Sequence, residues 1–356
     1  MTRPLFVILG VSALLGAIDR AAGNRLGLGQ HFEAGFRTLG PLGLSMAGIL
    51  CLSPLLAACC RPLSPLLARL GTDPALPACL LAIDMGGWQI GEALAENAAS
   101  ARFFGILASA TLGCTLSFTI PTGMGLYNEK DRGLFSRGLL YGLVTIPFGL
   151  FAGALCMGIS LPAAFRLCLP LILFSVLLGI ALARHPAETA RALRGYASFL
   201  RVLATLGLGI AAFSHLSGIA LLPGMMPLPE AMEVVSSIGI TLLGGLTLSE
   251  ILLRGLSRCA GALGRRIGLS ARGLVGLLLL YMSISAGLAA IPDMEDRDKV
   301  VAAAFSAAAA SCLTSHLAFT ARFSPETAGA LILCKTLAAF AAAALAVAAT
   351  KNKASA

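Results

Sequence analysis

Residues 138–160 read GLLYGLVTIPFGLFAGALCMGIS, an apolar stretch without a charged side chain. A helix rises about 1.5 Å per residue, so about 20 residues cross the hydrocarbon core of a bilayer, which is about 30 Å thick. The stretch lacks the alternation of polar and apolar residues that marks a strand of a membrane barrel. Residues 138–160 therefore predict a transmembrane helix.

Similar stretches recur along the whole chain. Of its 356 residues 57% are hydrophobic and 12% are charged, with a mean hydropathy of +0.88, whereas a soluble domain carries about 25% charged residues. The sequence predicts an all-α, polytopic integral membrane protein with about 10–11 transmembrane helices. The apolar stretches lie near residues 4–18, 39–60, 76–96, 101–122, 138–160, 163–183, 198–222, 234–253, 270–291, 300–320 and 327–349.

Small residues and basic loops add two further expectations. The 40 Gly and runs such as Ala302 to Ala310 predict close helix packing, because small side chains let backbones approach each other in lipid. The net charge of +9 comes from Lys and Arg spread over short loops, more on alternate loops than on the others. This pattern favours a cytoplasmic N-terminus, a lipid bilayer as the partner and no nucleic acid.

The chain shows a weak similarity to itself at a shift of about 196 to 199 residues, which is typical of the internal repeats of transporters. We expect a first transmembrane repeat over residues 1–160, a connecting helix and loop over 161–196, and a second repeat over 197–356, with five helices in each half. The spacing favours parallel repeats, and inverted repeats require one segment that enters and leaves on the same side. The matched pairs include Gly40 with Gly239, Leu52-Ser53 with Leu248-Ser249, Gly71 with Gly268, Asp84-Met85 with Tyr281-Met282, and Cys114 with Cys312.

Residues 76–96 carry an acidic group inside an apolar stretch. Asp84 is followed by Met85, Gly86 and Gly87 and then by Trp88, the only Trp of the chain. A carboxylate at this depth costs about 2.5–3.5 kcal/mol, so such acids usually face a partner or a ligand path. The paired Gly allow the helix to unwind, and a carboxylate near an indole suits an ammonium group. The alternative is a hydrogen bond between helices and an interfacial Trp.

Hydroxyl groups and a His mark the second half. Tyr281, Ser283 and Ser285 lie at the position that matches Asp84, and Ser315 and His316 follow in the next stretch. These side chains suit a small polar ligand, and His316 also suits a proton relay. The alternative is that they join helices by hydrogen bonds.

Three charged residues have either a gate or a structural role. Asp19 and Glu33 lie near the ends of the first apolar stretches, where the alternative is solvated loop charge. Lys335 lies inside the last stretch, where it either forms a fixed cation in the core or extends to the interface. Glu250 is expected to pair with Arg254, four residues further on.

The sequence contains no Walker loop, no GxSxG elbow and no HExxH motif. We therefore expect no catalytic residue, no metal, no cofactor and no enzymatic activity, and a gradient as the driving force of any transport. Whether the chain forms a homo-oligomer is left open.

The order of several short motifs resembles the EutH-type family of ethanolamine-utilisation membrane proteins over nearly the whole length. The resemblance implies uptake of ethanolamine across the bacterial inner membrane by a multi-pass protein. The motifs are Ala17-Ile-Asp19-Arg20, Phe32-Glu33-Ala-Gly35-Phe36, Asp84-Met-Gly-Gly, Ser117-Phe-Thr-Ile-Pro121, Asp131-Arg132, Leu143-Val-Thr-Ile-Pro147 and His316-Leu-Ala-Phe319.

The chain departs from the family pattern in three places, one of which is Glu92, where the pattern is basic or variable. Ser283-Ile284 stands where the pattern has two Asn, and Ser315 stands where an Asp precedes the His. The leading hypothesis is a secondary carrier or facilitator for protonated ethanolamine, in which Asp84 neutralises the ammonium. The alternatives are a carrier for another small amine or amino alcohol and a membrane sensor or assembly subunit without transport.

Overall fold

The computed structural model describes residues 2–83 and 87–351, and every element assigned in these ranges is helical. Seven helical segments there are long and apolar enough to cross a membrane. The chain is therefore an all-helical, multi-pass membrane protein. The seven segments are Gly29–Arg69, Ala98–Leu126, Lys130–Cys156, Leu161–Arg184, Pro186–Ser217, Leu228–Leu256 and Pro325–Thr350.

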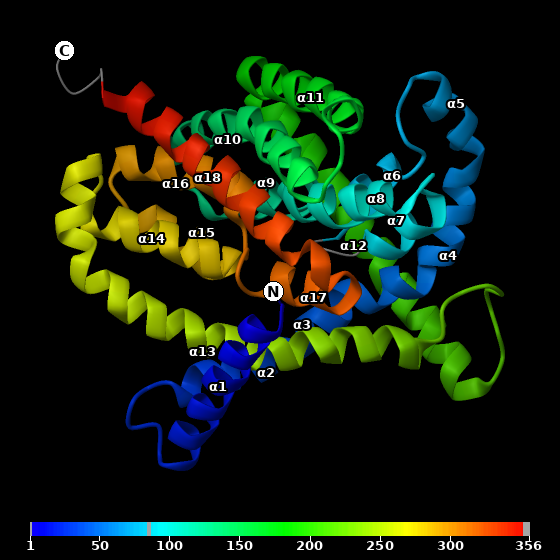
Figure 1. Cartoon of the computed structure of the whole chain (residues 1–356), viewed down its shortest axis with the longest axis horizontal. Coiled ribbons are helices and arrows are strands. Elements are labelled where there is room, and N and C mark those ends of the chain that lie inside the picture. Colours follow the sequence, from blue (N-terminus) through cyan, green and yellow to red (C-terminus); the bar gives the residue numbers. More distant parts are fainter. Residues whose placement is uncertain (1, 84–86, 352–356) are drawn as a thin grey trace. The chain divides into compact units, whose positions relative to one another are not determined.

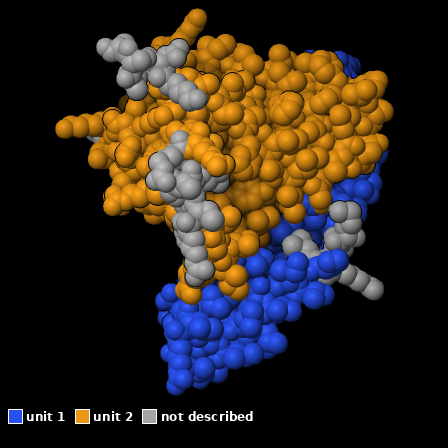
Figure 2. All heavy atoms as spheres, turned by 60° about the vertical axis from the view of Figure 1, so that its left-hand side comes forward, with its two compact units in different colours: residues 1–113, 196–248, 314–328 blue, residues 114–195, 249–313, 329–356 orange. Residues whose placement is uncertain are grey.

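The chain divides into two compact units, coloured separately in Figure 2. Unit 1 comprises residues 1–113, 196–248 and 314–328, and unit 2 comprises residues 114–195, 249–313 and 329–356. Each unit combines segments from both sequence halves, so the predicted division into repeats at residues 160 and 196 stays a prediction.

Unit 1 contains helices from the N-terminal third of the chain and from two later stretches, residues 196–248 and 314–328; Figure 1 labels most of these helices. Its elements are α1 (Thr2–Ala21), α2 (Gly29–Arg37), α3 (Leu39–Leu42), a π-helix at Gly43–Ala47, α4 (Gly48–Cys60), a 3-10 turn at Arg61–Leu63, α5 (Ser64–Arg69), α6 (Leu76–Leu81), α7 (Trp88–Leu94), α8 (Ala98–Arg102), a π-helix at Phe103–Gly113, α17 (Ser315–Phe323), a 3-10 turn at Pro325–Thr327, most of α12 (Pro186–Ser217) and the first half of α13 (Leu228–Ile267).

Unit 2 holds most of the remaining long helices. Its elements are a π-helix at Thr115–Thr119, α9 (Ile120–Leu126), α10 (Glu129–Cys156), α11 (Leu161–Arg184), the start of α12, the second half of α13, α14 (Ala271–Met282), α15 (Ile284–Ala290), a 3-10 turn at Ile291–Asp293, α16 (Asp296–Ala309) and α18 (Ala328–Lys351).

Small residues bring helices together in both units, as the sequence predicts. In unit 2 the backbone of α10 packs on α16, and a Cβ on Gly138 or Gly142 would overlap Val300 or Ala307 of that helix. In unit 1 a Cβ on Gly207 of α12 would lie 2.6 Å from the carbonyl oxygen of Gly48 in α4. Close approach of backbones provides the dispersion contacts that hold helices together where lipid replaces water.

Three predicted stretches are divided between shorter helices. Residues 76–96 form α6 and α7, residues 270–291 form α14 and α15, and residues 300–320 fall mostly in α16 and α17. Each of these stretches is mostly apolar, so its hydropathy resembles that of a continuous span. The breaks lie at small or polar residues, which weaken a helix locally.

The pair α14 and α15 forms a helical hairpin within unit 2. Ser283 joins the helices with extended backbone (φ −147°, ψ 112°), and a Cβ on Gly287 would lie 2.6 Å from the Cα of Leu280. In one continuous helix residues seven apart lie about 10 Å apart along the axis, so α15 must fold back along α14. Gly276 near the start of α14 also packs on Met294, which follows α15.

Candidate functional site

In unit 1 the segment that carries Asp84 is not a continuous helix. The helix α6 ends at Leu81, Ala82 has extended backbone (φ −65°, ψ 123°), and α7 begins at Trp88. Asp84 and Gly86 lie outside the described residues. The interruption shows that Trp88 does not follow Asp84 as the next turn of one uninterrupted helix from α6.

Gly87 holds the start of α7 close to its neighbours. A Cβ on Gly87 would lie 2.7 Å from the carbonyl oxygen of Ala78 and would overlap Ser109 Oγ. Ser109 is fully buried and donates a 2.7 Å hydrogen bond to the carbonyl oxygen of Phe104. Gly87 and Ala78 are nine residues apart and still in contact, which one continuous helix would not allow, and only Gly fits at position 87.

Trp88 is half-buried and packs against protein. Its ring stacks on Phe323 with ring centroids 6.2 Å apart and an interplanar angle of 27°. Phe323 lies at the end of α17, and Phe319 of the same helix belongs to the core cluster of unit 1. The structure thus places Trp88 next to α17, the helix that carries two of the other predicted ligand residues.

Ser315 and His316 begin α17. Thr314, which precedes them, has an unusual backbone (φ −120°, ψ −105°), and the side chain of His316 is completely buried. Phe323 lies seven residues after His316, which is about 10 Å along the helix axis. Trp88 therefore stacks on the far end of α17 and not on its N-terminal residues.

In unit 2 the other predicted ligand residues surround the tip of the α14–α15 hairpin. The hydroxyl of Tyr281 lies 2.5 Å from Thr336 Oγ1 in α18, while Ser283 forms the break itself and Ser285 is exposed. Ser311 Oγ accepts a 3.0 Å hydrogen bond from the backbone N–H of Ile284. The hairpin tip is thus joined to the unwound residues 310–313, which follow α16 in unit 2.

Sequence reasoning missed Ser311 and Thr336 as members of this polar group. Ser311 has a positive φ of 49°, which is unusual for a residue with a side chain. Thr336 is adjacent to Lys335 in an otherwise apolar stretch, and this position beside a buried charge could have drawn attention to Thr336. Neither feature shows from sequence alone which partner the hydroxyl meets.

Lys335 lies on the buried face of α18. Its side chain has 0% exposure, and Cys334, Ala338 and Ala339 on the same face are equally buried. Complete burial favours the fixed cation over an ammonium that reaches the interface.

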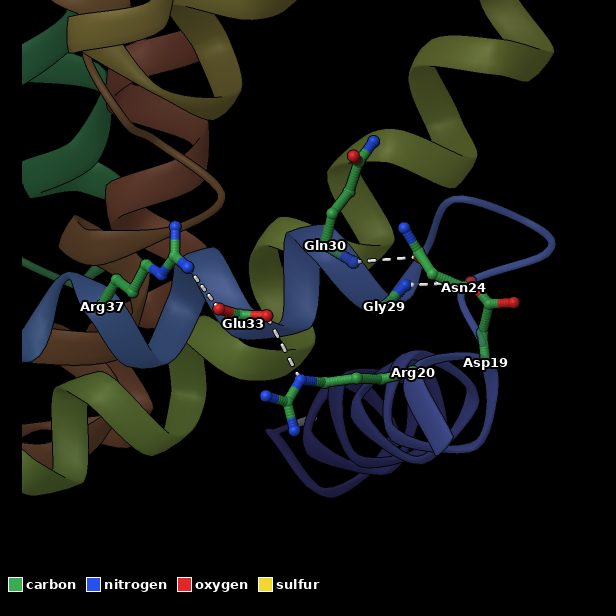
Figure 3. Close-up of polar contacts among 7 residues, drawn as sticks. All are labelled: Asp19, Arg20, Asn24, Gly29, Gln30, Glu33 and Arg37. Carbon is green, nitrogen blue, oxygen red and sulfur yellow. Dashed lines mark hydrogen bonds and ion pairs between the residues drawn. The ribbon is translucent and has the colours of Figure 1, made fainter. Parts of the chain in front are cut away.

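Asp19 organises the loop between α1 and α2 in unit 1 (Figure 3). Its carboxylate accepts hydrogen bonds from the backbone N–H groups of Leu26 at 2.7 Å, Leu28 at 2.7 Å and Gly29 at 2.9 Å. Figure 3 draws the bond from Gly29. Gly29 is the first residue of α2, where a negative charge is favourable. These contacts favour a structural role for Asp19.

The carboxylate of Glu33, in α2, contacts the side chains of two arginines next to this loop (Figure 3). It lies 3.3 Å from Arg20 Nε and 2.5 Å from Arg37 Nη2, and both Arg side chains are more than half exposed. The loop therefore connects the sequence motifs at residues 17–20 and 32–36.

The predicted ion pair of Glu250 with Arg254 in α13 is confirmed, with Glu250 Oε1 2.6 Å from Arg254 Nε.

Comparisons with known proteins agree with this membrane architecture. A family model described as ethanolamine utilisation protein, EutH, matches residues 1–349. The probable ethanolamine permease EutH of Listeria monocytogenes is 32% identical over 319 residues, which cover 89% of this chain and 86% of that protein.

Two further relatives match the chain at the same sequence identity. The uncharacterized protein YxeR of Bacillus subtilis is 32% identical over 330 residues, 92% of this chain and 89% of the relative. The probable ethanolamine permease EutH of Escherichia coli is 32% identical over 321 residues, 83% of this chain and 79% of the relative. No solved structure matches. The match of the family model over nearly the whole chain confirms the resemblance seen in the sequence, and the chain belongs to the EutH family of ethanolamine utilisation proteins.

Proposed function

We propose that the chain is a secondary carrier or facilitator that moves protonated ethanolamine across the bacterial inner membrane. The observation that carries the proposal is the interruption between α6 and α7, in the apolar stretch whose sequence includes Asp84. Interrupted helices inside membranes occur where the backbone is buried in protein or lines a cavity, and in transporters such breaks form the substrate site. Relatives described as probable ethanolamine permeases support the choice of ligand.

The charge of the ligand explains the need for an acid. A buried ammonium without a partner costs many kcal/mol, and a carboxylate removes most of that cost. In the proposal Asp84 neutralises the ammonium and the indole of Trp88 offers an aromatic surface beside it. Both residues belong to unit 1 in the sequence division, as do Ser315 and His316, to which we assign the hydroxyl of the ligand. This assignment requires that the ligand lie nearer the N-terminal end of α17 than the stack of Trp88 on Phe323.

The residues of the α14–α15 hairpin remain a separate prediction. Tyr281, Ser283 and Ser285 lie in unit 2, and the hydroxyl of Tyr281 is already bonded to Thr336. A substrate role for this group requires that a ligand replace or share that hydrogen bond. Tyr281→Phe distinguishes the two readings, because loss of uptake affinity supports a substrate role and an unchanged KM supports a structural one.

The direct test is uptake of labelled ethanolamine into proteoliposomes at low concentration and acidic pH, where the amine is charged. We expect saturable uptake by the wild type and at least a tenfold loss for Asp84→Asn. The matched control is Glu92→Gln, an exposed acid in α7 that should retain uptake. Normal uptake by Asp84→Asn would remove Asp84 from the mechanism.

Competition separates ethanolamine from related ligands. Excess unlabelled ethanolamine should abolish the signal, and choline and short alkyl amines should compete weakly. Stronger competition by another amine would assign the carrier to that ligand. Ligand binding without flux by a folded, monodisperse protein would instead identify a sensor or assembly subunit.

A further inference from the structure

Gln89 has an unpaired hydrogen-bonding group in the interior of unit 1. It is the second residue of α7, and its side-chain oxygen Oε1 is buried without a hydrogen-bond partner. In the described part of unit 1 this holds for one other side-chain atom, Oγ1 of Thr72. An acceptor that is removed from water and left unpaired lowers the stability of a fold, so each such group requires an explanation.

The packing of α7 shows on which side of the helix this amide lies. A Cβ on Gly91 would lie 3.0 Å from the Cα of Gly105, and a Cβ on Gly87 would overlap Ser109 Oγ, so both Gly face the longer π-helix of unit 1. Successive residues of a helix are about 100° apart, so Gln89, midway between the two Gly, projects from the opposite side of α7. The hydroxyl of Ser109 is therefore not its partner.

The residues on either side of Gln89 belong to the apolar interior. Trp88 packs against the core cluster of unit 1, and Ile90 is completely buried. The amide oxygen is thus held inside the protein directly after the break between α6 and α7. An unpaired acceptor at this place is available to a bound molecule that carries an N–H or O–H group.

The ammonium of the proposed ligand supplies such a group. A primary ammonium has three N–H donors, whereas the quaternary ammonium of choline has none. In the proposed function Trp88 lies beside the ammonium, and Ser315 and His316 bind the hydroxyl at the other end of the ligand. Gln89 follows Trp88 directly in α7, so the ammonium is the end of the ligand that we assign to it.

We propose that Gln89 selects primary ammonium ligands, because its side-chain oxygen accepts a hydrogen bond from the ammonium. The inference rests on the proposed function, since it names the ligand class of the same transport. A site with a buried acceptor for its ligand rejects an analogue that lacks the donor, because the acceptor then stays unpaired. Gln89 is thus a specificity-determining residue and does not neutralise the charge.

Inhibition of labelled ethanolamine uptake by unlabelled ethanolamine and by choline tests this role in proteoliposomes. Gln89→Met, which keeps the side-chain length and removes the acceptor, should lose at least about tenfold in affinity for ethanolamine and less than about twofold for choline. Unchanged affinity for ethanolamine would overturn the inference. Equal losses for both amines would also overturn it, because they would indicate a general disturbance of the site.

Thr72→Val is the matched control. It removes the other buried, unpaired side-chain oxygen of the described part of unit 1 and keeps the shape of the side chain. The ratio of the two affinities should stay that of the wild type in this variant. Gln89→Leu replaces Gln89→Met if the latter does not fold.

Thermal unfolding in detergent provides a measurement that does not require transport. Without ligand, Gln89→Met should unfold at the wild-type midpoint or above it, because the variant loses only an unpaired acceptor. Ethanolamine should raise the midpoint of the wild type more than that of the variant, since a ligand stabilises the folded state in proportion to its affinity. A lower midpoint of the ligand-free variant would reveal a partner of Gln89 within the protein and overturn the inference.

The two measurements separate the inference from the proposed function. Stabilisation of the wild type by ethanolamine without any uptake would count against transport, and its loss in Gln89→Met would still support the inference. Normal uptake with wild-type discrimination by Gln89→Met would overturn the inference and leave transport in place. Neither uptake nor stabilisation by ethanolamine would overturn both.

Discussion

Lys299 and Asp131 form an ion pair in unit 2, with Nζ 2.9 Å from Oδ2, although they are 168 residues apart in the chain. The Lys side chain is 9% exposed and the Asp side chain 14%. The pair connects the first turns of α16 and α10, the two helices that the small residues of unit 2 hold in contact. It is thus an electrostatic link at one end of a close-packed helix pair.

We expect Lys299→Met to destabilise the protein by about 3–5 kcal/mol, because it leaves a buried carboxylate without its partner. The double variant with Asp131→Asn should recover part of this loss, since no unpaired charge then remains. Thermal unfolding in detergent measures both effects. The control is Glu233→Gln, which breaks the exposed pair with Arg322 and should cost about 0–1 kcal/mol. Equal losses for both pairs would contradict the prediction.

Asp19→Ala should destabilise the loop between α1 and α2. It removes the carboxylate acceptor of three backbone N–H groups, of which those of Leu28 and Gly29 are buried, and each unsatisfied buried donor costs about 1–3 kcal/mol. Limited proteolysis should cut within residues 22–28 faster in the variant than in the wild type. Glu33→Gln is the matched control, because its partners are exposed arginines and its loss should hardly change cleavage. Unchanged cleavage of Asp19→Ala would refute the structural role.

Gly87→Ala should abolish uptake or lower stability by about 1–3 kcal/mol through overpacking. The added methyl group would contact the Ala78 carbonyl and Ser109 Oγ. The double variant Gly87→Ala/Ser109→Ala should therefore recover part of the loss, because it removes one of these contacts. Gly209→Ala is the control, since its Cβ would meet no atom within 4 Å. Uptake rates and unfolding midpoints of the three variants check the prediction, and normal behaviour of Gly87→Ala would contradict the close approach.

The α14–α15 hairpin predicts that its two ends lie on one side of the membrane. Arg272 and Asp293 line one cavity of about 650 Å³ at these ends, and both side chains are exposed. Arg272→Cys and Asp293→Cys should therefore react with an impermeant maleimide from the same side. Labelling of intact cells and of inverted vesicles measures the sidedness.

A continuous span provides the control for that experiment. Asn128→Cys and Ser160→Cys flank α10, whose 28 residues extend about 42 Å, and they should react from opposite sides. Replacement of Cys59, Cys60 and Cys156 by Ser lowers the background, because these are the described cysteines that are not buried. Opposite sidedness of positions 272 and 293 would show that α14 and α15 together cross the membrane.

A hairpin that enters and leaves on the same side bears on the predicted repeats. Inverted repeats need one such segment, whereas parallel repeats follow when every apolar stretch crosses. The break at Ser283 directly follows Tyr281-Met282, which the internal alignment pairs with Asp84-Met85 in the interval between α6 and α7. Sidedness of the hairpin therefore also tests the parallel arrangement that the loop spacing favours.

The sequence by itself determined that the chain is a helical membrane protein and to which family it belongs. Hydropathy sums over about 20 neighbouring residues, so residues 138–160 identify a span without any tertiary contact. The pair of Glu250 with Arg254 was equally predictable, because residues four apart meet on one helix face. The order of the short motifs was sufficient to identify the family, because motif order is read from the sequence and does not depend on how the chain folds.

Only the tertiary structure decided where membrane helices break and which polar groups meet. Residues 270–291 have the hydropathy of a span, yet the packing of Gly287 on Leu280 folds them into a hairpin. The complete burial of Lys335 and the hydrogen bond of Ser311 to the end of α14 depend on residues that are distant in sequence. Local composition sets the solvent that a segment prefers, whereas the free energy of a buried charge or a helix break depends on its neighbours in three dimensions.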